Sequence, residues 1–458
     1  MRATLIGHAC WLIETQGGNV LTDPVLMEPF EEGTVTSCPA RSVDIDDLPP
    51  LAAIIISHRH LDHYHLPSLA RLDRSVPLLC PEDALLLHGI RRLGFTDIRP
   101  LRGFETTRIG ALRIVGIPSV SETFQELGCV LADSSGVLLN QVDTPLTGAT
   151  IRRIRDEFGI IDVHLAMHAS QNFTFFEGRT QNLGEIHATN LSAALAVGAR
   201  VIVPGAAGFR FVDALDWLNP HLFPISRERF ARDLLRLDAA RTVTAVNPGD
   251  CLHIEAGTVR CQRQSAPFVR MLAEDTHRLE HDPTQPVPAL HDDNEADYPA
   301  DFLLRFAEGF VGQVLPALIG QGVASGDEVV REYCSREIVY RLEVVFPDGS
   351  ERGWTFRFDA QSVCVEEAPG QPDVRKRIAA SALADVCGGR RGCFWMRTRS
   401  RRASTLLALE RVGDALAVEA VEVRDLLSHL IILSKVAQKG EEQGLLEYYG
   451  LTVPPELL

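Results

Sequence analysis

The sequence lacks several features that would place it in a specialised class of protein. None of its ten cysteines forms a CxxC pair, and no stretch offers about eighteen uninterrupted apolar residues, the length of a transmembrane helix. The opening MRATLIGHACWLIETQGG has a histidine and a glutamate where a secretory signal has an apolar run. We therefore expect reduced cysteines, no membrane partner and a cytoplasmic protein.

The chain also lacks an excess of positive charge. Its formal net charge is −16, whereas proteins that bind nucleic acid usually display a basic surface, so we expect no nucleic-acid partner. One segment departs from this balance, because residues 388–402 contain six arginines. This segment is either a solvated basic face or a docking patch for an anionic cofactor or carrier, since arginine offers paired donors to anions.

The length and the pattern of the chain indicate two domains. At 458 residues the chain is too long for one core. Residues 1–265 alternate β-rich runs with helical stretches, and CVLADSSGVLLNQVD predicts a hairpin and hence antiparallel strands. A segment rich in proline and acidic residues predicts a linker at 266–300. Residues 301–458 follow as an accessory domain, with a hairpin across Pro-Asp-Gly-Ser and an apolar helix near the end.

Histidine is concentrated directly after a run of isoleucines. Four of the fifteen histidines lie within eight positions of the stretch IIISHRHLDHYH. The preceding AAIIIS predicts a buried strand, and ligand sites in α/β proteins usually follow such strands. The pattern HxHxDH is formed by His58, His60, Asp62 and His63. Imidazole binds zinc or iron and a carboxylate adds negative charge. We predict that His58 and His60 hold one metal ion and that Asp62 and His63 hold a second.

This loop resembles the hallmark of the metallo-β-lactamase superfamily. The segment LIGHACWLIETQGGNVLTDPVL is similar to the amino-terminal hairpin of the branch that contains ascorbate-6-phosphate lactonase and N-acyl-phosphatidylethanolamine phospholipase D. The resemblance implies an α/β fold, an αββα sandwich over residues 1–265, in which His8 and Asp23 lie near the metal loop in catalytic roles. The alternative for His8 and Asp23 is that they belong to a hydrogen-bonded turn and have no catalytic role. Asp143, in GVLLNQVDT, matches the family's bridging carboxylate, and Asp62 and Asp143 would also act in catalysis.

The chain departs from the family's pattern at two ligand positions. Most members have a histidine between the metal loop and the bridging aspartate, but residues 117–128 contain none. Glu122 is the carboxylate nearest to the expected position, and Glu126 is a competitor. The family's final histidine is also missing, because RVIVPGAAGFRF has glycine and alanine there.

A replacement for the final histidine is expected at the end of another strand. In IIDVHLAMHASQNF, His168 lies at the carboxyl end of a predicted strand and is the favoured ligand, whereas His164 lies deeper within it. The alternative for His168 is a core histidine satisfied by hydrogen bonds. His187, near a predicted helix start, is a weaker candidate, and His65 is expected to be exposed.

These departures shift the expected metal site toward oxygen ligands. Mixed histidine and carboxylate ligands with open positions favour iron that reacts with dioxygen. VIVPGAAGFRFVDALDWLNPHLFP is similar to a segment of the CMP-N-acetylneuraminate hydroxylase group, and a glutamate ligand resembles the diiron β-hydroxylase of the chloramphenicol pathway. The favoured function is a diiron oxygenase acting on a small molecule or a tethered intermediate. The alternatives are a zinc or manganese hydrolase of the lactonase or phosphodiesterase type and a metal-binding protein without turnover.

A Rieske iron–sulfur centre, which the sialic-acid hydroxylases carry, requires the patterns CxH and CxxH. Here CLH at 251–253 is followed by CQRQ at 261–264, which lacks the second histidine. We expect no such centre. An oxygenase would then need a separate reductase or ferredoxin, or a substrate that supplies its own electrons.

The remainder of the chain resembles the sterol-carrier family. The similarity rests on a tryptophan-containing hairpin, a short helix and a glycine-containing turn in residues 301–458. It implies a smaller α+β domain around an apolar tunnel. Such a domain would bind a lipid-like substrate or mediate formation of a homodimer.

Overall fold

The chain folds into two compact units. The structure, a computed structural model, describes residues 1–120, 124–168, 171–177, 183–206, 208–359, 362–367, 370–412 and 415–458. Unit 1 comprises residues 1–172, 182–286 and 453–458, and unit 2 comprises residues 173–181 and 287–452.

An eight-stranded sheet in unit 1 carries the histidine-rich loop. Its strands are β1 (Arg2–Gly7), β2 (Cys10–Thr15), β3 (Gly18–Thr22), β6 (Leu51–Ile55), β7 (Leu78–Cys80), β8 (Ile98–Pro100), β17 (Cys251–Glu255) and β18 (Thr258–Gln262). Their order is β18-β17-β1-β2-β3-β6-β7-β8. β2 is antiparallel to both β1 and β3, and β6 is parallel to β3. Since β1, β3 and β6 run in the same direction, their carboxyl ends lie at one edge of the sheet.

A seven-stranded sheet forms the second layer. Its strands are β9 (Thr106–Ile109), β10 (Leu112–Pro118), β11 (Leu127–Asp133), β12 (Gly136–Asn140), β13 (Val163–Met167), β14 (Val201–Gly205) and β16 (Thr242–Val243). Their order is β16-β14-β13-β12-β11-β10-β9. The strands β9 to β12 form an antiparallel meander that contains the predicted hairpin between β11 and β12, whereas β12, β13 and β14 are parallel.

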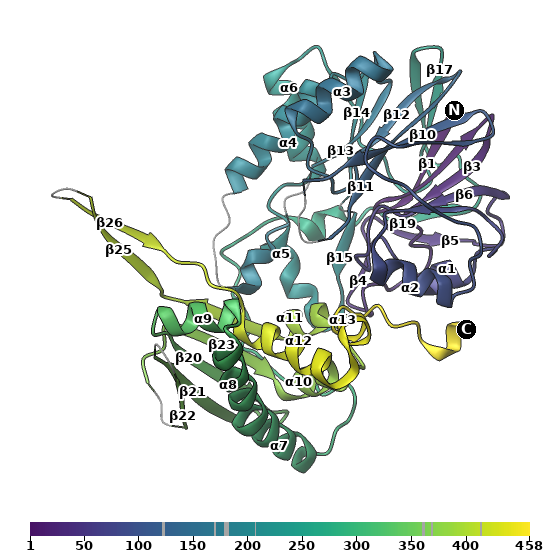
Figure 1. Ribbon diagram of the computed structural model, residues 1–458. Helices are drawn as coiled ribbons and strands as arrows, with labels where there is room; N and C mark the ends of the chain where they lie inside the picture. The colour runs from purple at the N-terminus through teal and green to yellow at the C-terminus, as the bar shows by residue number, and fades with distance from the viewer. Residues whose placement is uncertain are drawn as a thin grey trace. The chain divides into compact units, whose positions relative to one another are not determined.

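Helices cover the outer faces of the two sheets (Figure 1). Side chains of both sheets share one buried core between them, among them Trp11 and Leu131. The opposite face of the seven-stranded sheet packs on helices through residues such as Ile154, Leu191 and Phe230. The helices are α1 (Leu66–Ala70), α2 (Ala84–Arg92), α3 (Gly148–Phe158), α4 (Leu183–Val197), α5 (Asn219–Leu222) and α6 (Arg227–Leu237). The α/β sandwich expected from the sequence is confirmed.

Two short strand pairs extend unit 1 beyond its main sheets. β4 (Val35–Ser37) pairs with β15 (Phe209–Phe211), and β5 (Ala40–Val43) pairs with β19 (Val269–Ala273). The β5–β19 pair corrects the expected linker at 266–300, because residues 266–286 belong to unit 1. Local composition does not reveal a strand whose partner lies more than 200 residues away.

Unit 2 contains a five-stranded sheet with helices. The sheet has the order β22-β21-β20-β23-β24, and a separate hairpin is formed by β25 and β26. The strands are β20 (Val339–Val345), β21 (Glu351–Phe358), β22 (Val363–Glu366), β23 (Val374–Ala379), β24 (Ser400–Ser404), β25 (Leu407–Val412) and β26 (Ala415–Ala420). β20 and β21 form the hairpin expected across Pro-Asp-Gly-Ser. The unit is α+β, as expected, whereas its likeness to the sterol-carrier family stays a prediction.

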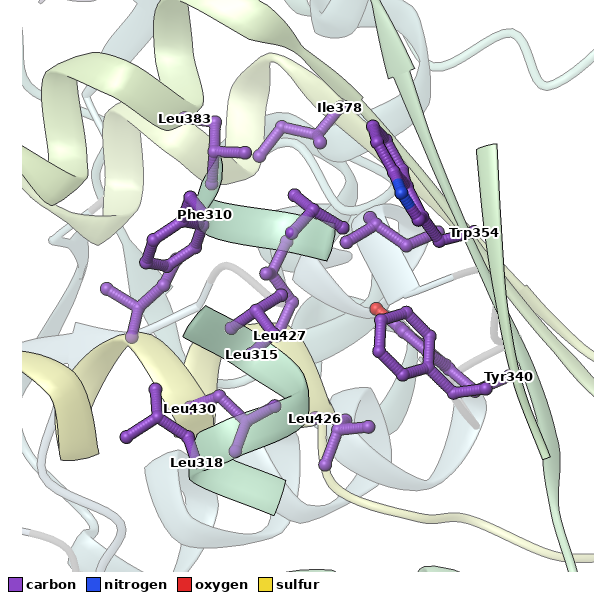
Figure 2. Close-up of a cluster of buried hydrophobic side chains, with 14 of the residues drawn as sticks. Phe310, Leu315, Leu318, Tyr340, Trp354, Ile378, Leu383, Leu426, Leu427 and Leu430 are labelled. Carbon is purple, nitrogen blue, oxygen red and sulfur yellow. The ribbon is translucent and has the colours of Figure 1, made fainter. Parts of the chain in front are cut away.

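The helices of unit 2 pack around one apolar core, drawn in Figure 2. They are α7 (Ala300–Gly309), α8 (Leu315–Ser325), α9 (Glu328–Ser335), α10 (Ala380–Cys387), α11 (Cys393–Thr398), α12 (Leu426–Lys439) and α13 (Glu441–Tyr448). A π-helical turn, Phe310–Val314, joins α7 to α8. By length and composition alone, the helical run Ala300–Ser325 could cross a membrane. Several of its side chains, including Phe310, Leu315 and Leu318, pack in the core of unit 2.

Candidate metal centre

The loops that follow several strands of unit 1 meet at one place. Ala9, Val142 and Ala206 form a small buried cluster that joins the loops after β1, β12 and β14. His8, Asp23 and Val142 have positive φ angles of 49°, 40° and 54°. Such backbone conformations cost non-glycine residues about 1–3 kcal/mol each and concentrate at functional sites. The backbone therefore marks this edge of the sandwich as the place to look for chemistry.

The structure brings the histidine-rich loop and the predicted bridging aspartate together. His58 Nε2 lies 2.9 Å from His60 Nδ1. His63 Nε2 lies 3.2 Å from Asp143 Oδ2 and 3.4 Å from Asp62 Oδ2. Ligand atoms of His58, His63 and Asp143 fall within 4.8 Å of one another. The five residues predicted from HxHxDH and GVLLNQVDT are thus neighbours.

Asp23 orients the imidazoles from behind. Its Oδ2 accepts a hydrogen bond from His63 Nδ1 at 3.0 Å and another from Ser57 Oγ at 2.9 Å. Since the serine hydroxyl donates to Asp23, it can accept from His58 Nδ1, which lies 2.9 Å away. In their neutral forms both imidazoles then carry their proton on Nδ1 and present a bare Nε2 to the centre. This arrangement, in which the rear ring nitrogen donates to a fixed acceptor, is typical of metal-ligating histidines.

His8 has the opposite tautomer. Its Nδ1 accepts a hydrogen bond from the backbone N–H of Gly208 at 3.2 Å, so the neutral ring carries its proton on Nε2. That Nε2 lies 3.1 Å from Asp62 Oδ2. His8, Asp62 and His63 are also close enough to hold an ion, and His8 Nε2 has no hydrogen-bond partner among the described residues. The catalytic role expected for His8 stays a prediction.

A buried nitrogen without a partner fits a metal ion at this place. His63 Nε2 is buried and has no hydrogen-bond partner among the described residues, despite its proximity to the carboxylates of Asp62 and Asp143. A buried polar atom without a partner costs about 1–3 kcal/mol. A metal ion between the bare nitrogen and these carboxylates would satisfy all of them. The residues present therefore fit the metal site that the family resemblance implies.

The charges of the site also favour a cation. Burial, followed by the neighbouring histidines, lowers the pKa of His58 well below its ordinary value, so the ring is neutral. Burial raises the pKa of Asp62, but His63 and His8 outweigh it and hold that pKa well below its usual range. Burial lowers the pKa of His63, yet Asp62 and Asp143 raise it well above its ordinary value. Without metal, His63 therefore binds the proton that a metal ion would replace.

Two further carboxylates lie at the centre. Glu126, the competitor named from the sequence, is 8% exposed, and its Oε1 has no hydrogen-bond partner within the part of the chain that the structure describes. Burial, and then the charge of Asp143, raises the pKa of Glu126 to about 7. Sequence reasoning missed Glu31, which accepts a hydrogen bond from the backbone of Asp62 and has a strongly raised pKa caused by desolvation and by Asp62. Glu122 lies outside the described residues.

His168 is held by a hydrogen bond at its rear nitrogen, as a ligand would be. It is buried at the end of β13, and its Nδ1 donates to Gly205 O at 2.7 Å. Burial lowers its pKa to about 4, so the ring is neutral and its Nε2 is bare. A cavity of about 70 Å³ is lined by both His168 and His8. The assignment of His168 as a ligand stays a prediction.

The other candidate histidines have structural partners. His164 Nε2 lies 2.9 Å from Gln141 Oε1 in the core, and His187 Nε2 lies 3.0 Å from Asp233 Oδ2. The expectation that His65 is exposed was wrong, since it is 8% exposed. It precedes α1, where its Nδ1 bonds Ser68 Oγ at 2.7 Å.

A buried arginine that sequence reasoning missed ties the strand-end loops together. Arg41 is 4% exposed, and its guanidinium donates to Ile6 O at 3.0 Å, Val25 O at 2.7 Å and Ser37 Oγ at 2.8 Å. Its Nε also lies 3.1 Å from a carboxylate oxygen of Glu28. Nothing in the local sequence distinguishes Arg41 from a surface arginine.

Comparison with known proteins finds a family match over part of unit 1. Residues 2–127 match the family model of the Beta-lactamase superfamily domain, a segment that includes the HxHxDH loop. Over these residues the chain is similar to the metallo-β-lactamase superfamily, as its sequence indicated.

Curated relatives match only parts of the chain. The 4-amino-L-phenylalanyl-[CmlP-peptidyl-carrier-protein] 3-hydroxylase of Streptomyces venezuelae is 33% identical over 126 residues, which cover 26% of this chain and 23% of that protein. A Mycobacterium tuberculosis protein named as a Rieske 2Fe-2S iron–sulfur protein is 27% identical over 183 residues, 37% of this chain and 34% of its own length. The chain thus spans about a third or less of each of these relatives.

Solved structures align over about half of the chain. The diiron β-hydroxylase CmlA of Streptomyces venezuelae is 18% identical, with 57% of this chain and 54% of that chain covered and a TM-score of 0.39. An isothiocyanate hydrolase from Delia radicum gut bacteria is 19% identical, with 56% and 100% covered and a TM-score of 0.41. At these scores neither alignment carries an argument about the chemistry of this chain.

Proposed function

We propose that unit 1 is a dinuclear metal enzyme that works as a diiron oxygenase on a small molecule or a tethered intermediate. The observation that supports this proposal best is the number of carboxylates around His63. Asp62 and Asp143 lie within 3.4 Å of its Nε2, and buried Glu126 is close enough to Asp143 for the two charges to interact. Oxygen-rich sets that also contain histidine suit iron or manganese better than zinc.

In this proposal each side chain has one task. His58, His60 and a glutamate would hold one ion, Asp62 and His63 would hold the other, and Asp143 would contribute a further carboxylate. The ions, when bound, would supply activation of dioxygen for attack on the substrate. Asp23 fixes the ring of His63. His8 keeps a proton at Nε2, 3.1 Å from Asp62, where that proton is available to a reacting group.

The hydroxylase relative supports an oxygenase over a hydrolase, and its name suggests a substrate carried by a protein. The matched region of 126 residues is short, so the substrate and the partner proteins of this chain are proposals. A separate reductase or ferredoxin would supply electrons, unless the substrate supplies them.

A second candidate function is a zinc-dependent hydrolase. It is favoured by the neutral imidazoles of His58, His60 and His168, whose pKa values burial lowers. Three histidines with an open fourth position are a common catalytic zinc site. In that case the substrate would be a lactone or a phosphodiester.

Metal analysis separates the two functions. The full chain is expressed in iron-supplemented medium and purified without chelator, and its metals are measured. Two irons per chain, with a visible absorption band that bleaches on reduction and returns in air, would support the oxygenase. Tightly held zinc together with phosphodiesterase activity would overturn it. His60→Ala and Asp143→Ala should abolish metal loading, whereas His277→Ala, at an exposed position, should load normally.

A further inference from the structure

Unit 2 has a cavity of its own, far larger than the one beside His8. Its volume is about 530 Å³. Its lining includes the cationic side chains of Lys376, Arg397 and Arg424 and apolar side chains such as those of Met396 and Ile432. Concave sites of this size with a few polar groups and an apolar wall are typical of small-molecule binding.

Helix α12 borders both this cavity and the core of unit 2. Leu426, Leu427 and Leu430 point into the core drawn in Figure 2. Ser428 and Ile432 line the cavity; because residues three and four apart share a face of a helix, they lie on one face of α12. The apolar part of the lining is continuous with the core, since Met396 and Tyr448 belong to both.

The floor of the cavity carries an unusual buried charge. Lys376 lies on β23 between Val374 and Ile378, at the alternate positions that face the core, and its side chain is 4% exposed. Its Nζ lies 2.8 Å from Asp425 Oδ2. Lysine is almost never fully buried without a reason of this kind.

A second buried cation lies directly opposite Lys376. Arg402 of β24 is its cross-strand partner and is 6% exposed. Its Nη2 donates to Val423 O, but its Nε has no hydrogen-bond partner among the described residues. Like charges directly opposite each other in a sheet are destabilising. Two buried cations therefore interact with one partly buried carboxylate, Asp425, and an anion in the cavity would offset the excess.

The arginine-rich segment adds a free cation at the same place. Within unit 2, five of its six arginines have partners: Arg390 with Asp385, Arg391 and Arg399 over the ring of Trp395, Arg401 with Ser400 O, and Arg402 with Val423 O. Arg397 is exposed, lines the cavity and forms no ion pair with any described residue. The sequence offered two interpretations of this segment, a solvated basic face and a docking patch for an anion. The docking patch fits Arg397, whereas the other five arginines have partners within unit 2.

We propose that this cavity binds a small organic anion. The anionic head would lie against Lys376, Arg397 and Arg424, and an aromatic or aliphatic body would lie against Met396 and Ile432. Glu422 and Asp425 also line the cavity. They limit the excess of positive charge, so a compact anion of one or two charges fits better than a polyanion.

Calorimetric titration of the full chain with phenylphosphonate tests this site. We expect saturable binding with a dissociation constant of about 1 mM or lower, and weaker binding of inorganic phosphate, which has the head without the body. Benzoate, run in parallel, identifies the preferred head: binding of either aromatic anion supports the proposal, and binding of neither overturns it. The titration is repeated after chelation of metals. Binding that disappears on chelation would overturn the proposal, because the anion would then be bound at a metal centre.

Arg397→Gln is the decisive variant, since an exposed side chain without an ion pair can be changed without disturbing the fold. Loss of a charge-assisted hydrogen bond should weaken phenylphosphonate binding about ten-fold or more. Arg331→Gln, which removes the same charge from an exposed position on α9 outside the cavity, is the matched control and should bind like the parent chain. Equal affinities in the two variants would contradict the assignment.

A variant of the apolar wall provides a second readout. Ile432 is half-buried, so Ile432→Glu is expected to fold and to place a negative charge in the cavity. It should abolish phenylphosphonate binding while metal content stays at the parent level. Retained binding would overturn the proposed position of the ligand. The outcome is independent of the function proposed for unit 1.

Discussion

His63 and Asp23 form a buried pair in which His63 Nδ1 lies 3.0 Å from Asp23 Oδ2, with the two side chains at most 1% exposed. The aspartate follows β3 and the histidine lies in the loop after β6, so the pair joins the ends of two parallel neighbouring strands. The hydrogen bond fixes which nitrogen of His63 faces Asp62 and Asp143. Metal affinity at this site should therefore depend on a residue that would not itself bind the metal.

The first prediction concerns Asp23→Asn. The carboxylate accepts three hydrogen bonds, from Ser57 N, Ser57 Oγ and His63 Nδ1, and an amide cannot accept on both of its terminal atoms. We expect the affinity for metal to fall about ten- to a hundred-fold, as for other residues that orient a ligand. Competition with a chromophoric chelator measures the change. Asp47→Asn, on the surface, should leave the affinity unchanged, and an unchanged affinity in Asp23→Asn would contradict the orienting role.

The second prediction decides between two glutamates. Glu126 is buried and lies beside Asp143, and one of its oxygens has no hydrogen-bond partner in the described ranges. Glu126→Gln and Glu122→Gln are compared by metal analysis after identical purification. If Glu126 is a ligand, its variant should lose metal while the Glu122 variant stays loaded, and the reverse result would restore Glu122. Full metal content in both variants would show that neither Glu126 nor Glu122 is a metal ligand.

The parts of the site that the sequence predicted are those encoded in short, contiguous patterns. HxHxDH places four side chains on one loop, and the strand before it follows from its apolar run. Asp143 was predicted because GVLLNQVDT resembles the strand that carries the family's bridging carboxylate. Residues whose role depends on distant contacts were missed or misjudged. Glu31 reaches the site from a loop with no periodicity, and His65 is buried because it bonds Ser68 at the start of α1.

The third prediction is a pH dependence of stability caused by His164. Burial lowers the pKa of His164 to about 3, from an ordinary value of 6.5. Because the unfolded chain binds this proton more tightly, the free energy of unfolding is unaffected above pH 6.5 and falls as the pH drops from there toward 3. At pH 5 the loss should be about 2 kcal/mol relative to pH 7.

His164→Leu should remove this loss, because leucine has no group that binds a proton. The variant should still fold, since Gln141 Oε1 would keep its hydrogen bond from Met167 N. Urea unfolding of the metal-free chain at pH 7 and pH 5 measures the difference for each variant. His277→Leu, at an exposed position of unit 1, should keep the pH dependence of the parent chain. If His164→Leu also kept it, the acid sensitivity would arise elsewhere.

The fourth prediction concerns Arg41, whose guanidinium holds Ile6 O, Val25 O and Ser37 Oγ in the interior of unit 1. Arg41→Met removes these donors and leaves two backbone carbonyls unsatisfied, at about 1–3 kcal/mol each. Arg41→Lys should recover little of the loss, because an ammonium group cannot reproduce the planar fork of donors. Urea unfolding should show both variants to be less stable by about 2 kcal/mol or more, whereas Arg71→Met, at an exposed position, should have the stability of the parent chain.

Since Ile6 and Val25 lie close to His8 and Asp23 in the chain, both Arg41 variants should also bind metal more weakly. Normal stability together with normal metal affinity in Arg41→Met would show that the loops keep their arrangement without this arginine.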